Sequence, residues 1–308
     1  MSGKKLLLIL ILTLIAVFVI SASVFGASAI DVLRRSEDAD KHVSYRGLKT
    51  VNVYFAGRSA VSTLKVIHLK PNKTRTEYFT PVQLAGTILI ENGPGVWRFD
   101  PRESEWEKTF VRASSCGAWD NALENYDVKL IGTDRVAGRP AYVIHAIPRM
   151  KGEKAHRVWI DKDYYLIIRT EVESPHGVVL DSSRYTDIEI NPGDISPASF
   201  KITGKVKSAP ENKSTSIKIV KPTYLPKGYK LVAVESVSVN CRCCAHLQFS
   251  NGVNTISMFQ RPSDKCAAPS RINSKVSNVL TWARDGVLYT LMGKVSRSEL
   301  QKIANSTK

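Results

Sequence analysis

The residues most able to do chemistry in this chain are cysteines. Three of the five lie within four positions, in the stretch NCRCCAHLQFSNG of residues 240–252. Thiols this close together can bind a metal ion, exchange disulfides or form structural disulfides. A tetrahedral zinc site would draw its ligands from Cys241, Cys243, Cys244 and Cys266, with His246 as a further candidate. A structural disulfide would join Cys266 to Cys241 or to Cys243.

The element that must position these thiols is predicted to be one strand over residues 231–250, with its odd-numbered side chains facing a core. Cys241 and Cys243 would point inward, whereas Cys244 and His246 would point to the outer side. Because alternation sends the thiols to both faces, a shared metal site would need a bulge, and a disulfide is favoured. A redox function comes third, because the chain has no C-x-x-C motif.

The dipeptide at residues 251–252, Asn-Gly, predicts a type I′ hairpin turn after this strand. A two-residue turn there pairs Leu247 with Ile256, and Ala245 with Met258. The buried face thus continues on the next strand. In this register Cys241 lies opposite Pro262, a few residues before Cys266, so a disulfide would fasten the following loop to the sheet.

No catalytic motif is found elsewhere. The chain lacks G-x-S-x-G, H-E-x-x-H and a P-loop, and none of its six histidines forms an i, i+4 pair. His145, in YVIHAIP, is interpreted as a sheet residue rather than a general base. Asp161 and Asp163 are interpreted as turn residues. The sequence therefore predicts a binding protein with no catalytic residue and no cofactor, not an enzyme.

The N-terminus predicts export. Lys4 and Lys5 precede an apolar run, and Ala27-Ser28-Ala29 fits a cleavage site, so residues 1–29 are predicted to be a signal peptide. An uncleaved membrane anchor is the alternative. An oxidising compartment favours disulfides, and the odd number of cysteines leaves Cys116 either as a thiol or paired with whichever cysteine remains.

The formal net charge is +16, from 44 Lys and Arg against 28 Asp and Glu. Nucleic acid is a common partner of so basic a chain, but export argues against it. Anionic lipid, an acidic partner or an anionic envelope surface fits better. The scattered distribution of the basic residues leaves a general contribution to solubility as the alternative.

The chain after residue 29 divides into two predicted domains. Residues 30–203 begin with a helix over residues 30–42 and continue as an antiparallel meander of about ten strands, typical of an open half-barrel wrapped on helices. Residues 204–218, GKVKSAPENKSTSIK, are predicted to be a linker. Residues 219–308 predict a smaller α+β domain with a second hairpin at Asp285-Gly286. Ser296 and Glu299 form a capping box for a terminal helix. The fold class is thus mainly β, α+β.

The segment from Asp134 to Ile190 resembles the RseB/MucB family of periplasmic sigma-E regulators. The resemblance is carried by Arg135 to Arg139, Pro148-Arg149, Trp159-Ile160-Asp161 with Leu166, and Gly177 to Leu180. SYRG at Ser44 to Gly47 fits the end of the family's first helix. HLQFSNGVNTISMFQRP and GKVSRSELQKIANS resemble its second domain. The C-x-C-C cluster is not part of the family pattern, and Lys49 to Leu69 is hard to align with it.

The resemblance implies a half-barrel like that of the lipoprotein carriers LolA and LolB, with an apolar cavity. It also implies a periplasmic protein that binds the periplasmic part of a membrane-spanning anti-sigma factor, shields it from a protease, and is released by lipid or lipopolysaccharide. A lipid or lipoprotein carrier is the first alternative, and a metal- or redox-responsive envelope sensor the second. The sequence assigns no ligand-binding residue and leaves open whether the protein is a homo-oligomer.

Overall fold

The computed structural model describes residues 28–55, 58–93, 95–108, 118–207, 218–239, 242–263, 279–293 and 295–308. The predicted signal peptide up to residue 27 lies outside these ranges, as do Cys116, Cys241 and Cys266. Within them, no helix is both long and apolar enough to cross a membrane.

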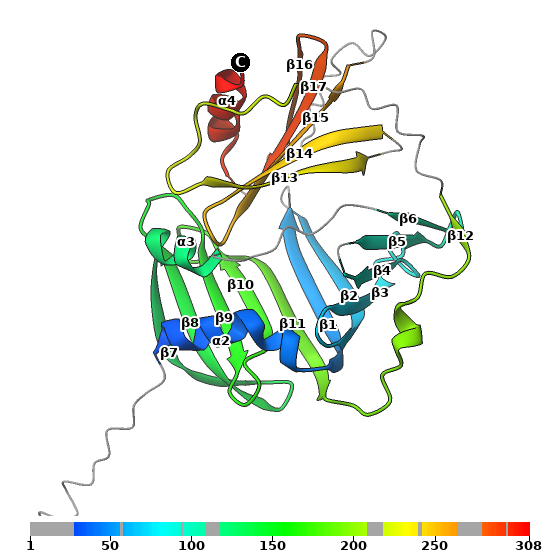
Figure 1. The fold of residues 1–308 in the computed structure, drawn as a ribbon. Helices are drawn as coiled ribbons and strands as arrows, with labels where there is room; N and C mark the ends of the chain where they lie inside the picture. The colour runs from blue at the N-terminus through cyan, green and yellow to red at the C-terminus, as the bar shows by residue number, and fades with distance from the viewer. Residues whose placement is uncertain are drawn as a thin grey trace, which may run out of the picture.

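Two antiparallel sheets dominate the molecule (Figure 1). The large sheet contains β1 (Tyr45–Phe55), β2 (Arg58–Leu69), β3 (Lys73–Thr80), β4 (Ile88–Asn92), β5 (Val96–Asp100), β6 (Glu105–Lys108), β7 (Tyr126–Val136), β8 (Arg139–Pro148), β9 (Ala155–Asp161), β10 (Ile167–Glu173), β11 (Val179–Ile190) and β12 (Lys205–Val206). The small sheet contains β13 (Lys230–Val239), β14 (Arg242–Ser250), β15 (Thr255–Pro262), β16 (Val279–Arg284) and β17 (Val287–Gly293). The helices are α2 (Ala29–His42), α3 (Ala118–Asn125), α4 (Arg297–Ser306) and the short 3-10 helix η1 (Pro197–Phe200).

The large sheet consists of two meanders rather than the single meander that the sequence predicts. Its strand order is β12-β6-β5-β4-β3-β2-β1-β11-β10-β9-β8-β7, so β1 to β6 form one run and β7 to β11 the other. Antiparallel pairing of β1 with β11 joins the two runs, and β12 pairs parallel to β6. Local sequence patterns identify strands well but do not encode which distant strands become neighbours, which explains the difference.

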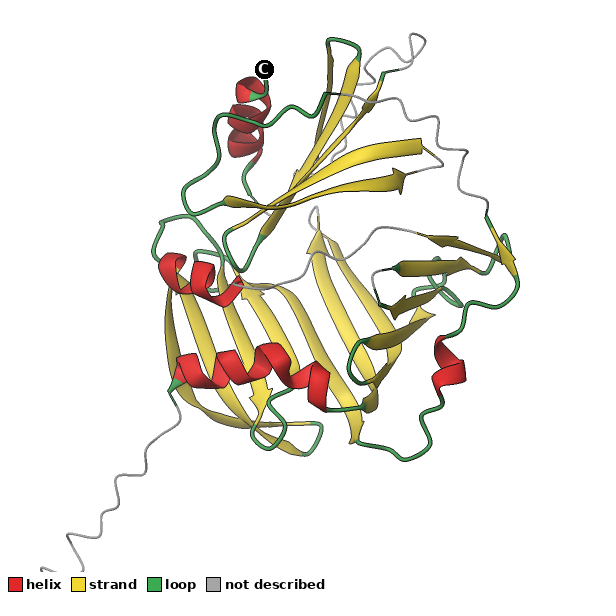
Figure 2. Cartoon of the chain, viewed as in Figure 1, coloured by secondary structure: helices red, strands yellow, loops and turns green. Residues whose placement is uncertain are grey.

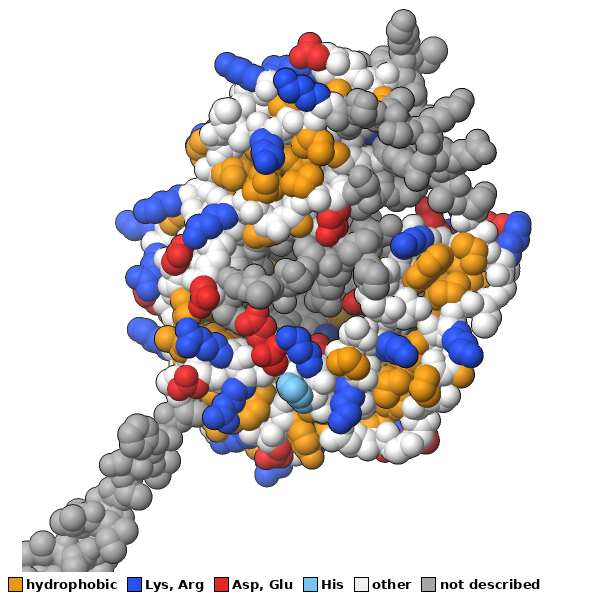
Figure 3. Space-filling view, viewed as in Figure 1, with side chains coloured by type: hydrophobic (Ala, Val, Ile, Leu, Met, Phe, Trp, Pro, Cys, Tyr) orange, Lys and Arg blue, Asp and Glu red, His pale blue; other side chains and the backbone are white. Residues whose placement is uncertain are grey.

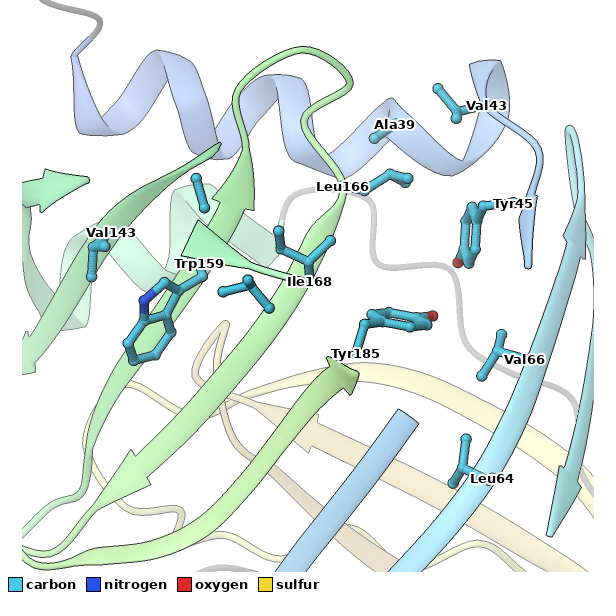
Figure 4. Packing of buried hydrophobic residues seen from close by; sticks show 12 residues of the cluster. Ala39, Val43, Tyr45, Leu64, Val66, Val143, Trp159, Leu166, Ile168 and Tyr185 are labelled. Carbon is cyan, nitrogen blue, oxygen red and sulfur yellow. The ribbon is translucent and has the colours of Figure 1, made fainter. Parts of the chain in front are cut away.

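Helix α2 lies across one face of the large sheet, as Figure 2 shows, and confirms the helix predicted after residue 29. Ser28 caps it by accepting a hydrogen bond from the backbone N–H of Asp31 at 3.1 Å. Val32 and Leu33 pack against Ile144 and Ile160 of β8 and β9. At its other end α2 joins a second core cluster, whose members in Figure 4 include Ala39, Val43, Tyr45, Leu64, Val66, Leu166, Ile168 and Tyr185.

The small domain packs α4 against its sheet. Leu300 and Ile303 of α4 are fully buried in one cluster with Leu247 and Met258 of β14 and β15. Ser296 accepts the N–H of Glu299, which confirms the predicted N-cap. The Glu299 side chain does not complete a capping box. Its carboxylate instead lies 2.7 Å from Lys302 and accepts the Tyr224 hydroxyl at 2.6 Å.

The prediction of a single strand over residues 231–250 is wrong. β13 and β14 pair antiparallel, with Val239 opposite Arg242, so the chain reverses direction between these two residues. Cys243 and Cys244 therefore lie near the start of β14, close to this reversal, rather than in the middle of one long strand. A continuous period-2 pattern cannot distinguish one long strand from two paired ones when no Gly or Pro marks the turn.

The predicted register of the next hairpin is displaced by two residues. Leu247 lies opposite Met258, and Phe249 opposite Ile256, so four residues form the turn. Asn251 explains the longer loop, because its side-chain oxygen accepts the N–H groups of Val253 and Asn254 at 3.1 and 2.7 Å. The second predicted hairpin, at Asp285-Gly286, is confirmed by the pairing of β16 with β17.

Candidate functional site

A cavity of about 420 Å³ lies where the two sheets meet. Helix α2, strands β8 to β10 and the β14–β15 turn all contribute to its wall. The lining residues are Leu33, Ile144, Ala146, His156, Val158, Thr170, Glu171, Val172, Val253, Asn254 and Thr255. Most of these side chains are apolar, and His156 and Thr170 from the large domain add a few polar groups. A mainly apolar cavity with a few polar groups is typical of a site for a small amphiphilic or apolar ligand.

The β14–β15 turn closes one side of this cavity because it is hydrogen-bonded to the large domain. Asn254 and Asn251 donate from their side-chain amides to the hydroxyl of Tyr126 at 3.1 and 3.4 Å. Asn125 at the end of α3 donates to the carbonyl of Asn251 at 3.3 Å, and Asn121 donates to the carbonyl of Ser250 at 2.8 Å. The turn of the small domain is thus held against α3 and the start of β7.

Tyr126 connects this junction to the cavity. Its side chain is 1% exposed, and its ring lies edge-on to His156, a cavity residue, with the ring centroids 5.9 Å apart. Burial raises the pKa of the Tyr126 hydroxyl, so this group stays protonated at neutral pH. Tyr126 thus contacts a residue of the cavity wall with its ring and the β14–β15 turn with its hydroxyl.

We expect Tyr126→Phe to loosen the junction between the domains. The change leaves the amide donors of Asn251 and Asn254 without their buried acceptor, which costs about 1–3 kcal/mol. Small-angle X-ray scattering should show a larger radius of gyration, while circular dichroism shows unchanged strand content. Tyr224→Phe is the matched control, because the Tyr224 hydroxyl contacts Glu299 within the small domain and not the junction. Unchanged scattering for Tyr126→Phe would show that these hydrogen bonds do not set the domain arrangement.

The side of β8 to β10 that faces away from α2 carries an ionic network. Arg157 lies 2.7 Å from Glu173 and 3.6 Å from Glu171, and His145 lies 3.2 Å from Glu173. Arg169 approaches Glu171 at 2.5 Å. Both glutamates are buried and both have partners, which is what buried carboxylates need for stability. His145 is therefore a sheet residue beside this network, as its sequence context indicates.

Asp161 is a structural turn residue, which confirms the interpretation of the WIDKD stretch. The carboxylate is fully buried and lies 2.5 and 3.2 Å from two nitrogens of Arg139. It also accepts the backbone N–H groups of Asp163 and Tyr164 at 3.1 and 2.8 Å. These four contacts tie the turn after β9 to Arg139 of β8, which is a structural function.

The structure corrects the predicted environment of Cys244 and His246. Both were expected on an outer, solvent-facing side, yet each is only 4% exposed. The His246 ring stacks on Phe259 of β15 with centroids 4.3 Å apart, and burial lowers the pKa of His246. Both faces of β14 are therefore covered: Leu247 and Phe249 on one face lie in the core under α4, and the Phe259 ring covers His246 on the other.

The predicted metal and disulfide partners do not come together within the described part of the chain. Cys241 and Cys266 lie outside it, and Cys243 is described only as part of β14. In the described ranges no three His, Cys, Asp or Glu side chains are grouped as metal ligands. The disulfide from Cys266 to Cys241 or Cys243, and the zinc alternative, both stay predictions.

Sequence patterns do not identify the cavity residues. The alternation in YVIHAIP places Ile144 and Ala146 on one face of β8, but it does not show that α2 and the β14–β15 turn border that face. Among the residues around the cavity, only Asn251 has a local sequence signal, and that signal identifies it only as a hairpin residue. Its additional contact with Tyr126 joins residues from two predicted domains, which no local pattern can indicate.

The fold and the cavity define a two-domain, β-rich binding protein whose candidate ligand site lies at the junction of its domains. The family model described as the MucB/RseB N-terminal domain matches residues 28–204, and the chain belongs to this family. Members of the family are regulatory binding proteins, which confirms the prediction that the chain is not an enzyme.

Two curated relatives illustrate the degree of similarity. The sigma-E factor regulatory protein RseB of Haemophilus influenzae is 25% identical over 146 residues, which are 46% of each chain. The sigma factor AlgU regulatory protein MucB of Pseudomonas aeruginosa is 24% identical over 193 residues. This alignment covers 59% of the present chain and 60% of MucB. The chain thus matches about half to three-fifths of the length of these relatives.

Solved structures extend the likeness to nearly the whole chain. A crystal structure of MucB superposes with a TM-score of 0.66 at 19% identity, covering 90% of this chain and 96% of MucB. MucB in the Pseudomonas aeruginosa MucA/MucB complex gives a TM-score of 0.64 at 18% identity, covering 91% and 98%. At these identities the likeness shows the fold, and it confirms the predicted fold class.

Proposed function

We propose that this protein binds the periplasmic part of a membrane-spanning anti-sigma factor, and that a lipid-like amphiphile in the interdomain cavity controls this binding. The observation that carries the proposal is that both domains contribute wall residues to one mainly apolar cavity. Family membership supports the regulatory function, and MucB itself is seen in complex with MucA.

The cavity offers a physical route for this control. A ligand that fits the cavity in one domain arrangement better than in another shifts the protein toward the first arrangement. If the anti-sigma factor prefers the other arrangement, each ligand lowers the affinity for the other by the same factor. Tyr126 is well placed for this coupling, because its ring contacts His156 of the cavity and its hydroxyl holds Asn254 of the small domain.

The proposed location is the periplasm. The basic n-region and the small residues before residue 30 support a cleavable signal peptide. The basic net charge fits an acidic partner segment or an anionic lipid surface there. Figure 3 shows that Lys and Arg side chains are scattered over the face in view, so the charge supports general attraction rather than one defined patch.

The proposed function is tested by binding to the purified periplasmic domain of an anti-sigma factor from the same organism. We expect the two proteins to elute together in size-exclusion chromatography, and lipopolysaccharide or dodecyl phosphate to separate them. Binding of amphiphile without binding of the anti-sigma domain would instead support a lipid or lipoprotein carrier.

Filling the cavity with a large side chain should weaken ligand binding. Ala146 lines the cavity, and a tryptophan there would occupy space that an acyl chain needs. We expect Ala146→Trp to reduce the affinity for dodecyl phosphate at least about tenfold in isothermal titration calorimetry, a loss of about 1.4 kcal/mol. The matched control is Ala283→Trp, at an exposed position of β16. Equal affinities of both variants would place the ligand elsewhere.

A further inference from the structure

Lys49 lies on the α2 side of the large sheet, and among the described residues no carboxylate pairs with it. It lies on β1 directly after a bulge, opposite Tyr185 of β11 and Leu64 of β2. Both neighbours are at least 95% buried. The Lys49 ammonium nitrogen lies 5.2 Å from the centre of the Tyr185 ring. Its surroundings are thus mainly aromatic and aliphatic.

The charge of Lys49 is poorly compensated. No carboxylate of the described chain lies within 4.0 Å of its ammonium group, whereas Arg46 on the same strand pairs with both Glu189 and Asp194. Burial lowers the pKa of Lys49, and the charge of Asp40 opposes this effect from a longer distance. Asp40 itself accepts the hydroxyl of Tyr45 at 3.2 Å.

A partly buried ammonium group without a counter-ion costs free energy, and such groups are usually paired. A methionine at this position would fill similar space among the same neighbours without that cost. The sequence nevertheless places a lysine there. An anionic ligand would supply the missing partner, because a lysine ammonium binds phosphate or carboxylate as a compact point charge.

Lys49 and the cavity lie on the same side of the sheet. Thr170 lines the cavity, and its hydroxyl lies 2.9 Å from that of Ser183 on β11. Ser183 pairs with Val51 of β1, and Lys49 is the next residue of β1 on that side. Two strand spacings of about 4.8 Å separate β10 from β1, so the cavity wall and the backbone of β1 lie about 10 Å apart.

From this arrangement we infer that Lys49 binds the acidic head group of an amphiphile whose apolar chain lies in the interdomain cavity. The inference rests on the proposed function and makes it more specific, because it requires a negatively charged head group. The phosphate or carboxylate would lie at β1, beside the Tyr185 ring, and the chain would extend toward Thr170 and the β14–β15 turn.

Isothermal titration calorimetry with three probes tests this inference. Dodecyl phosphate carries the chain and the charge, dodecyl maltoside the chain alone, and inorganic phosphate the charge alone. We expect the protein to bind dodecyl phosphate most tightly. We expect Lys49→Met to weaken binding of dodecyl phosphate about tenfold and to leave binding of dodecyl maltoside unchanged, because a charged hydrogen bond contributes about that factor. Lys49→Arg should keep most of the affinity.

Lys129→Met is the control, because Lys129 is exposed on β7 and the same chemical change there should leave both affinities unchanged. The melting temperature of Lys49→Met should equal or exceed that of the unmodified protein, since the change removes a poorly compensated charge. Equal binding of dodecyl phosphate by Lys49→Met and the unmodified protein would overturn the assignment of Lys49 alone.

Two other outcomes also decide against the inference. Failure of the unmodified protein to bind either amphiphile would overturn lipid binding as well, and thus the proposed function of the cavity. Binding of inorganic phosphate as tight as that of dodecyl phosphate would show a simple anion site without the apolar chain.

Discussion

Arg139→Met should destabilise the large domain by about 3–5 kcal/mol, the cost typical of leaving a buried carboxylate without its partner. Arg139 makes two contacts with Asp161, whose carboxylate is fully buried. The methionine keeps most of the length of the side chain but supplies no positive charge. Chemical denaturation should show the loss as a lower midpoint with an unchanged slope.

A second substitution distinguishes the loss of the ion pair from the loss of side-chain packing as the cause of this destabilisation. Asp161→Asn removes the buried charge, and its amide oxygen can still accept the N–H groups of Asp163 and Tyr164. In the double variant with Arg139→Met, we therefore expect a large part of the stability to return. Arg135→Met, at an exposed position of β7, is the control and should change stability by less than about 0.5 kcal/mol. No recovery in the double variant would assign the effect to packing instead.

Gly47→Ala should destabilise the same domain by about 3 kcal/mol, at the upper end of what overpacking usually costs. A methyl group at Gly47 would overlap the backbone oxygen of Asp187 and lie 2.9 Å from a ring carbon of Tyr185. Backbone atoms of a paired strand cannot move aside without breaking the ladder between β1 and β11. Each kcal/mol should lower the melting temperature by roughly 2–4 °C in a domain of this size.

Gly193→Ala is the matched control, because a methyl group at Gly193 meets no atom within 4 Å. We expect it to leave the melting temperature unchanged or to raise it slightly, since alanine reduces the entropy of the unfolded chain. If both glycine variants have the melting temperature of the unmodified protein, β1 and β11 do not approach each other as closely as in the structure.

These two sites also show what the resemblance to known regulators rests on. Gly47 ends the SYRG stretch, and Arg139 and Asp161 lie in two other stretches that carry the resemblance. Each holds the large sheet together, through a close approach of strands or a buried ion pair. Such residues identify a fold well, but none of the three is in the cavity wall.

The features that could be predicted are those that depend on interactions between residues close in sequence. The helix over residues 29–42, the hairpin at Asp285 and the cap at Ser296 all depend on residues close in sequence, and all three are present. The joining of β1 to β11 and the contact of Asn254 with Tyr126 depend on residues more than a hundred positions apart. The candidate site lies where these distant contacts meet, so the sequence alone does not show it.

The pairing of β1 with β11 has a consequence for how the protein folds. Each meander pairs strands that are neighbours in sequence, so each can form early, whereas joining them requires closure of a loop of more than a hundred residues. β1 precedes β11 by more than a hundred residues in the chain and must wait for β11 before it can pair on that side. Thr170 and Lys49 lie on opposite sides of this joint, so the geometry that we assign to ligand recognition is completed only in the last, slowest step of folding.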